Sequence, residues 1–316
     1  MEMATTTTVE DLPADVLACA LRRLDGRSLA AASCATTGLR ALAADPGTWR
    51  ALCLARWPSL AAADPGLLSS ASPQRLFADA FPFPHPCAAP IDHAAAPTSP
   101  VLLPSDLVSA VDVYHRGGAT PLLSRVVETS ASSSWFLASP FRVDCTAGPP
   151  ATAAGAAAPA PADLELSWIL IDPATARAVN VSSRRPVAVD RHWYTGDALV
   201  RYALVLGGCK FEATVTCAAE DPARVREISL TVEDADGAAV SGEGSLRLIA
   251  AAMAGPRLGG EEGQLVETAR RRYQDFVRSK RGRKESKARK EVLVDLCCSA
   301  VSAVAVLSFI ATVALR

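Results

Sequence analysis

The chain has 316 residues, of which 50% are hydrophobic and 21% charged, so it can bury a substantial core and is not a disordered protein. Its length is typical of two domains. The net charge of −1 argues against a globally basic nucleic-acid-binding protein, but this total hides a segregation. Residues 270–290 contain 11 Lys and Arg against Asp275 and Glu285, a local charge of +9, and the rest of the chain carries −10.

Several short helices are predicted at the start of the chain, within residues 11–58. Pro13 suits the first turn of a helix, where its missing N–H group is not needed. Apolar residues then recur at helical spacing, and Ser28 and Thr48 are predicted to cap two of the following helices. Residues 75–80 are predicted to form a further short helix.

The pattern of residues 10–58 resembles an F-box. It opens with Leu12-Pro13-Ala14-Asp15-Val16-Leu17 and closes with Asp45-Pro46-Gly47-Thr48-Trp49-Arg50-Ala51-Leu52. One departure is Gly38, which stands where many F-boxes have an aromatic residue. The resemblance implies a helical module that docks on the Skp1-type adaptor of a cullin–RING ubiquitin ligase.

A short helical module cannot bury all of its apolar side chains, and the surplus forms a patch that a partner covers. The alternative is a small helical bundle that uses the same residues only as its own core. The residues expected to contact the adaptor are Leu12, Pro13, Val16, Leu17, Leu21, Leu24, Leu29, Cys34, Leu39, Trp49 and Leu52.

A β-rich domain is predicted for residues 105–255, after a helical and Pro-rich linker at 59–104. Short apolar or alternating runs between turn residues indicate antiparallel strands in a sandwich or a jelly-roll-like arrangement. The low-complexity Ala/Pro segment at 147–162 is predicted to be a disordered surface insertion. The most regular strands are predicted at 164–170, 187–189, 200–206, 211–217, 225–232 and 245–250.

No catalytic motif or metal-binding spacing is found, so no catalytic residue, metal or cofactor is expected. The cysteines are expected to be reduced thiols. His115 and His192 each neighbour other polar or aromatic residues, but such histidines are more often structural. Trp135, Trp168 and Trp193 could line a ligand groove, although at strand spacing they are more often core residues.

A transmembrane tail anchor is predicted for residues 292–315, after a basic juxtamembrane segment at 261–290. Residues 296–315 are 20 uncharged residues, which span roughly 30 Å as a helix, the thickness of a bilayer core. The preceding basic block places the body in the cytosol, with the endoplasmic reticulum or another endomembrane as the expected location. The expected anchor residues are Leu296, Val301, Val304, Leu307, Phe309, Ile310 and Leu315. Cys297 and Cys298 either fill the helix or are palmitoylated.

Three further segments, 112–117, 135–144 and 193–197, together with the tail resemble a subgroup of plant F-box proteins. Its members carry one uncharacterised β-rich domain and a C-terminal membrane segment. The fold class expected is α+β: a small all-α F-box module, a β-rich domain and a transmembrane helix. The function implied is a non-catalytic, membrane-tethered substrate-recognition subunit of a Skp1–cullin–F-box ligase for an unknown protein client.

Two alternatives to this function remain open. Some plant F-box proteins carry lectin-like β-sandwiches, so the β-rich region could instead bind a glycan or a lipid headgroup. The chain could also be an F-box scaffold that binds its adaptor without joining a ligase. The client and the residues that would bind it are not assigned by the sequence.

Overall fold

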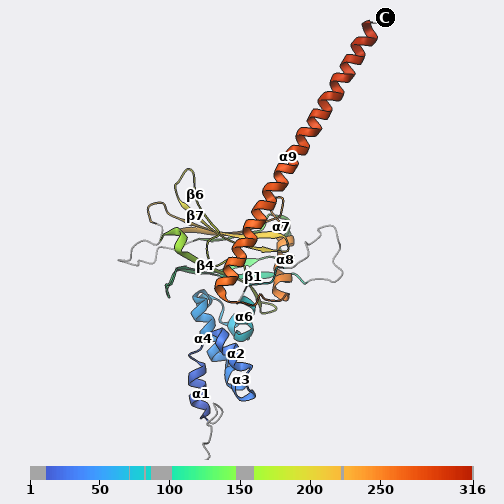
Figure 1. The fold of residues 1–316 in the computed structure, drawn as a ribbon. Coiled ribbons are helices and arrows are strands. Elements are labelled where there is room, and N and C mark those ends of the chain that lie inside the picture. The colour runs from blue at the N-terminus through green and yellow to red at the C-terminus, as the bar shows by residue number, and fades with distance from the viewer. Residues whose placement is uncertain are drawn as a thin grey trace, which may run out of the picture.

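The computed structural model describes residues 12–70, 72–81, 83–86, 102–146, 160–221 and 224–314. Short helices come first, then two antiparallel sheets, and a long helix ends the described chain (Figure 1). The N-terminal helices are α1 (Ala14–Leu21), α2 (Gly26–Ser33), α3 (Thr37–Ala43), α4 (Pro46–Arg56), η2 (Pro58–Ala62), α5 (Pro65–Ser70) and α6 (Pro73–Ala80).

The strands form one sheet in the order β2-β1-β4-β5 and a second in the order β3-β9-β8-β7-β6. The strands are β1 (Asp106–His115), β2 (Pro121–Ser130), β3 (Arg142–Thr146), β4 (Leu164–Asp172), β5 (Arg177–Asn180), β6 (Ala188–Arg191), β7 (Ala198–Leu206), β8 (Cys209–Cys217) and β9 (Val225–Glu233). The remaining helices are α7 (Ser134–Ala138), η3 (Pro161–Asp163), α8 (Gly242–Ala254) and α9 (Glu262–Ala314).

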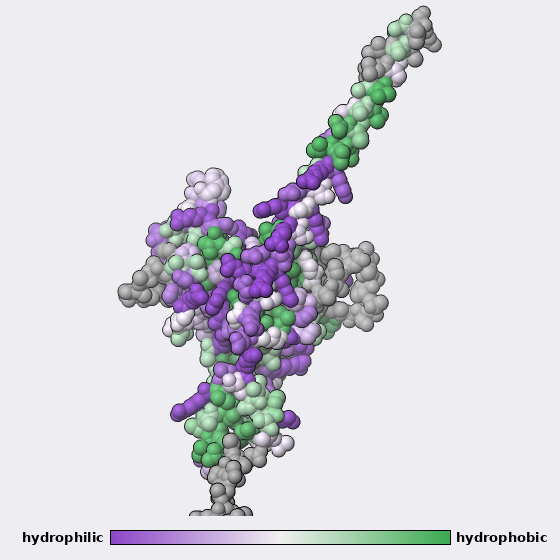
Figure 2. Space-filling view, viewed as in Figure 1, coloured by the Kyte–Doolittle hydropathy of each residue, from purple (hydrophilic) through white to green (hydrophobic). Residues whose placement is uncertain are grey.

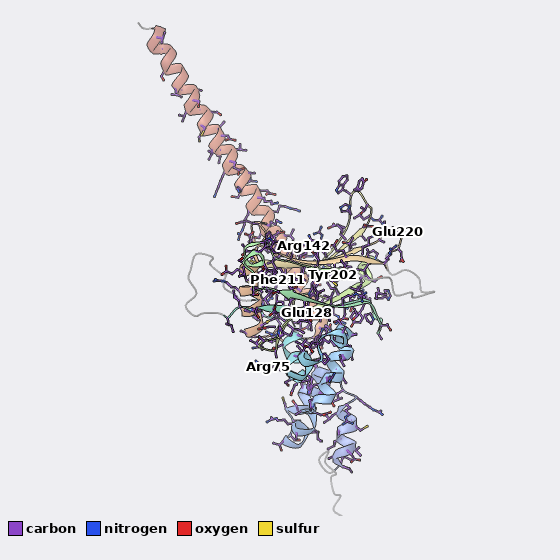
Figure 3. The ribbon with its side chains drawn as sticks, turned by 180° about the vertical axis from the view of Figure 1, so that it is seen from behind. Arg75, Glu128, Arg142, Tyr202, Phe211 and Glu220 are labelled. Carbon is purple, nitrogen blue, oxygen red and sulfur yellow. The ribbon has the colours of Figure 1, made fainter. Side chains whose placement is uncertain are left out.

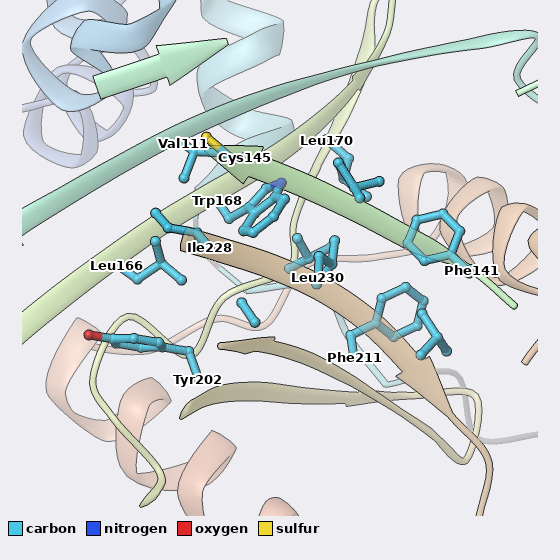
Figure 4. Packing of buried hydrophobic residues seen from close by; sticks show 14 of the residues in the cluster. Val111, Phe141, Cys145, Leu166, Trp168, Leu170, Tyr202, Phe211, Ile228 and Leu230 are labelled. Carbon is cyan, nitrogen blue, oxygen red and sulfur yellow. The ribbon is translucent and has the colours of Figure 1, made fainter. Parts of the chain in front are cut away.

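The main hydrophobic core lies between the two sheets. Trp168 and Leu166 from β4 meet Tyr202, Phe211 and Ile228 from the other sheet, and all five are fully buried (Figure 4). Seen from behind, Tyr202 and Phe211 lie within the strand layers, above the N-terminal helices (Figure 3). This arrangement buries one face of each sheet against the other.

The N-terminal helices cover the outer face of the four-stranded sheet. Trp57 and Leu60 share a hydrophobic cluster with Val108 and Ala110 of β1 and Ile169 of β4. β1 is therefore buried on both faces, which explains its nearly continuous apolar sequence. The expected small all-α module placed ahead of a separate β-rich domain is wrong, because these helices complete their core against the sheet.

The first half of α9 packs against the five-stranded sheet. Leu265, Val266 and Ala269 of α9 form a small cluster with Leu204 of β7 and with Phe83. Ion pairs continue this contact as far as Arg283, which pairs with Asp236 at 3.2 Å. Beyond that point α9 projects away from the body (Figures 1 and 2), and its described side chains are exposed.

In the part of the chain that the structure describes, no helix has the length and apolarity needed to cross a bilayer. The predicted transmembrane anchor, and with it the membrane localisation and the orientation of the body, is therefore a wrong prediction. Residues 292–314 are not a separate helix. They are the far end of α9, a 53-residue helix whose first half is polar. Among the predicted anchor residues, Leu296, Val301 and Val304 are exposed, the side chains of Leu307, Phe309 and Ile310 are not described, and Leu315 lies outside the described residues.

Residues 245–250, predicted as a strand, belong to helix α8. The alternation of Leu246 and Leu248 with polar neighbours imitates a strand, but the buried set also contains Ile249 and Met253 at helical spacing. The Ser241 side chain accepts a hydrogen bond from the backbone N–H of Gly244 at 3.2 Å and caps the helix. Most of the predicted insertion at 147–162 lies outside the described residues.

Candidate functional site

Helices α2, α3 and α4 each start at a residue whose side chain accepts a hydrogen bond from a free backbone N–H group. Asp25 accepts a hydrogen bond from the backbone N–H of Ser28 at 2.8 Å, and Asp45 accepts one from that of Thr48 at 3.1 Å. Ser28 and Thr48 were predicted as the caps, but each lies inside its helix and also donates its hydroxyl to the aspartate. Thr36 caps α3 in the same way, so each chain reversal is defined locally.

Phe77 of α6 holds these short helices together. Its ring lies 5.6 Å from that of Trp49 and 5.5 Å from that of Trp57. A Cβ atom added at Gly26 would lie 2.4 Å from Phe77, so the start of α2 is in direct contact with this ring. The Trp49 indole N–H also donates to the backbone carbonyl of Ala43 at 2.7 Å, which joins α4 to the end of α3.

An exposed apolar surface lies at the free end of these helices, on α1 and the residues just before it. The side chains of Leu12 and Val16 are 44% and 49% exposed, and Pro13 is exposed between them. Of the residues of α1, only Leu21 is buried. Figure 2 shows hydrophobic residues gathered over this end of the molecule. We call Leu12, Pro13 and Val16 the α1 surface.

The residues predicted to bind the adaptor divide into three groups by burial. The exposed ones are Leu12, Pro13, Val16 and Cys34. Half-buried ones are Leu17, Leu24, Leu39 and Leu52. Leu21, Leu29 and Trp49 are buried within the chain itself. The structure therefore gives the first group direct access to a partner, whereas the last group supports the helices from beneath.

A buried carboxylate attaches the helices to the sheet. Asp112 of β1 accepts hydrogen bonds from the Ser59 backbone N–H at 3.0 Å, the Ser59 hydroxyl at 2.7 Å and the Ser124 hydroxyl at 2.6 Å. Burial raises the pKa of Asp112, although these hydrogen bonds act in the opposite direction. The N-terminal helices are thus held on β1 by polar as well as apolar contacts.

A second polar junction joins α4, β4 and the first turn of α9. Glu262 accepts from Arg56 at 2.7 Å and lies 2.9 Å from Arg184, which also pairs with Glu165 at 3.1 Å. Burial alone would raise the pKa of Glu262, but Arg56 and Arg184 hold that pKa below its usual value. Arg184 has a positive φ of 63°, a conformation that costs a non-glycine residue energy and needs such surrounding contacts.

No local pattern in the sequence indicates these two junctions. Ser59 and Asp112 are 53 positions apart, and Arg56 and Glu262 are 206 apart. Each residue alone is an ordinary polar residue, and only the packing of the helices on the sheet brings the partners together.

The other candidates from the sequence do not converge on one site. Trp168 is buried between the sheets, whereas Trp135 and Trp193 are exposed on different elements. His115 ends β1, and His192 bonds within its own turn. Across the residues that can be described, no group of three or more His, Cys, Asp and Glu side chains could hold a metal ion. The described cysteines are free thiols, and burial raises the pKa of Cys53 to about 12.

Comparison with known proteins finds three relatives from Arabidopsis thaliana. The chain is 34% identical over 286 residues to the probable F-box protein At2g36090, a match that covers 87% of this chain and 84% of the relative. It is 34% identical over 303 residues to the F-box protein At3g44326, a match that covers 85% of this chain and 80% of the relative. It is 30% identical over 307 residues to the F-box protein At2g27310, covering 88% of each. No protein-family model and no solved structure matches the chain.

Proposed function

The chain belongs to the family of F-box proteins, and we propose that it works as the substrate-recognition subunit of a Skp1–cullin–F-box ubiquitin ligase. In this proposal residues 10–58 are the F-box that docks on a Skp1-type adaptor, and residues 105–255 hold the client. The chain contributes no catalytic group, because ubiquitin transfer belongs to the enzymes recruited through the adaptor and the cullin.

The observation that carries the proposal is the α1 surface. Apolar side chains exposed together at the start of a helix are typical of a surface that a partner covers. Leu17 and Leu24 are half-buried beside this surface, and Cys34 is exposed on the neighbouring helix pair. We propose that the exposed and half-buried members of the predicted set contact the adaptor, and that Leu21, Leu29 and Trp49 keep their helices in position.

The docking experiment replaces Leu12, Pro13 and Val16 together by Ala in the full chain. We expect the affinity for a purified Skp1-type adaptor to fall at least about 30-fold, since several apolar contacts at the centre of the interface are lost. The thermal unfolding temperature is expected to stay unchanged, because all three side chains are exposed. Binding can be measured by isothermal titration calorimetry.

Val189→Ala is the matched control, because Val189 is similarly exposed but lies on β6. We expect it to bind the adaptor as the wild type does. Undiminished adaptor binding by the triple variant would exclude the docking proposal. Co-purification of a cullin with the wild-type complex would distinguish a ligase subunit from a scaffold that binds the adaptor alone.

A further inference from the structure

The hairpin between β6 and β7 ends in two aromatic side chains that point into solvent. Trp193 is 89% exposed and Tyr194 is 79% exposed. Their ring centroids lie 5.6 Å apart, so they form one apolar feature rather than two scattered residues. Large aromatic side chains gain much free energy from burial, and a pair left in water on a folded protein indicates a surface that a partner covers.

The turn that carries this pair is rigidly constructed. The backbone N–H of His192 donates to the carbonyl of Asp197 at 2.8 Å, and that of Gly196 donates to the carbonyl of His192 at 2.9 Å. His192 Nδ1 also accepts from the Thr195 backbone N–H at 3.2 Å. Gly196 takes a positive φ of 72°, which glycine adopts at no steric cost. The backbone that carries the two rings is therefore held in place before any partner arrives, which lowers the entropy lost on binding.

The base of the turn is attached to the body of the protein. Asp197 is buried, and its carboxylate accepts a hydrogen bond from the backbone N–H of Ala219 at 3.0 Å, in the loop after β8. The carboxylate also lies 3.6 Å from the Arg226 guanidinium. The hairpin tip is thus braced by the neighbouring loop and does not rely on β6 alone.

The side-chain polar groups of Thr195 and Asp197, and Nδ1 of His192, are already engaged at the turn. Thr195 Oγ1 lies 3.1 Å from His192 Nδ1 and accepts from the Asp197 backbone N–H at 3.3 Å, and Asp197 is engaged with Ala219. A glycan would need several free donors and acceptors around the aromatic rings. The tip also projects from the body (Figure 1) and exposes both rings, so it suits a concave apolar pocket on another protein better than a sugar chain.

We propose that the tip of the β6–β7 hairpin, Trp193 and Tyr194, is where this F-box protein holds its client, and that the client is a protein with an apolar pocket that accepts both rings. This inference rests on the proposed ligase function. Figure 1 shows the β6 end of the molecule facing away from α1–α4. A client bound there and an adaptor bound to the α1 surface would occupy opposite ends of the molecule and would not compete.

The experiment places a photo-crosslinking amino acid, p-benzoylphenylalanine, at position 193 of the full chain expressed in cells. The same amino acid at position 135 is the matched control, because Trp135 is 77% exposed but lies on α7. A protein that crosslinks at 193 and not at 135 is then identified and purified. Its affinity is measured for the wild type and for the variants Trp193→Ala, Tyr194→Ala and Trp135→Ala.

We expect the affinity of that purified protein to fall about 30-fold or more in Trp193→Ala and about 10-fold in Tyr194→Ala, with no change in Trp135→Ala. Crosslinking alone does not support the proposal without this loss. The proposal is overturned by equal affinity of all variants, by crosslinks to glycans instead of a protein, by the same partners at both positions, or by no crosslink at 193.

Measuring adaptor binding shows whether a negative result contradicts only the hairpin proposal or the proposed ligase function itself. Trp193→Ala is expected to bind the Skp1-type adaptor as the wild type does, because its substitution lies far from the α1 surface. If adaptor binding persists while client affinity is unchanged by Trp193→Ala, only the hairpin proposal fails. If the wild type binds no adaptor, the ligase function fails.

Discussion

Single polar residues decide how the N-terminal helices attach to the sheet. Asp112 is fully buried, yet each of its carboxylate oxygens accepts a hydrogen bond from Ser59 or Ser124. A buried charge normally costs free energy unless it is well hydrogen-bonded, and here three donors provide those bonds. The raised pKa of Asp112 shows that burial still outweighs these bonds.

Replacing Asp112 by Ala is expected to lower the free energy of unfolding by about 3 kcal/mol, because the donors of Ser59 and Ser124 lose their acceptor. Asp112→Asn is the matched control and keeps an acceptor of the same shape, so its effect is expected to stay below about 1 kcal/mol. Urea denaturation at pH 7 measures both values. Equal losses in the two variants would contradict this account and assign the effect to the charge.

The raised pKa of Asp112 also predicts how the stability of the protein changes with pH. An acid whose pKa is higher in the folded state binds its proton more readily when folded, so its contribution to stability is lost as pH rises from 3.8 through the raised value. The wild type should therefore lose stability relative to Asp112→Asn over that rise. A constant difference between the two proteins across the range would contradict this expectation.

At the scale of elements, α9 is one helix with two different environments. Its first turns are held by apolar contacts with β7 and Phe83 and by the Glu262 junction, and its far part extends from the body. The junction joins α4, β4 and α9, so release of Glu262 affects two helices at once. Because the pKa of Glu262 is lowered in the folded state, its ion pairs stabilise the fold fully at pH values above its usual pKa of 4.5. This contribution is lost as pH falls through the lowered pKa.

Acid, or the substitution Glu262→Gln, is expected to loosen the first turns of α9 before the sandwich unfolds. The loss of stability at pH 7 should be about 1–2 kcal/mol, because the side chain is partly exposed and its ion pairs are screened. Hydrogen exchange of Leu265 and Val266 measures the loosening. Glu267→Gln removes an exposed pair with Arg271 and should change exchange little. Equal effects of the two variants would contradict a specific role for the junction.

At the scale of the whole molecule, the protein is layered. The N-terminal helices, the four-stranded sheet and the five-stranded sheet follow one another, with apolar clusters between them. α9 runs along these layers, from the junction of Glu262 with α4 and β4 to the ion pair of Lys280 with Glu233 of β9. The α1 surface and the hairpin tip lie at opposite ends of this stack (Figure 1). Under the proposed function, this arrangement would keep the adaptor and the client apart on one body.

Two truncations test which part of α9 belongs to the folded body. Removing residues 284–316 is expected to leave the thermal unfolding temperature unchanged, because the described side chains there are exposed. Removing residues 262–316 should lower it by about 10 °C or more, since Leu265, Val266 and Phe276 leave the surface of the sheet. Differential scanning calorimetry measures both. A lower temperature for the shorter deletion would show that the projecting part contributes to the fold.

The sequence by itself determined the features that depend on near neighbours. The short N-terminal helices and several strands could be predicted, because caps, turns and apolar spacing act over a few residues. Membership of the F-box family could also be predicted, from the local pattern between Leu12 and Leu52. Local patterns gave wrong predictions in two places. At 245–250, leucines alternating with polar residues imitate a strand, and at 292–315 an uncharged run resembles a separate membrane helix but continues the long helix α9.

Tertiary structure decided what depends on distant partners. Trp168 and Trp193 both lie in a strand-rich part of the sequence, and no local pattern distinguishes them. Trp168 is buried between the sheets, whereas Trp193 lies at a turn that projects into solvent. The contacts of Asp112 with Ser59 and of Glu262 with Arg56 cross 53 and 206 positions of the chain. Burial and long-range hydrogen bonds arise only when the layers meet, because they depend on packing between elements, which near neighbours in the sequence do not specify.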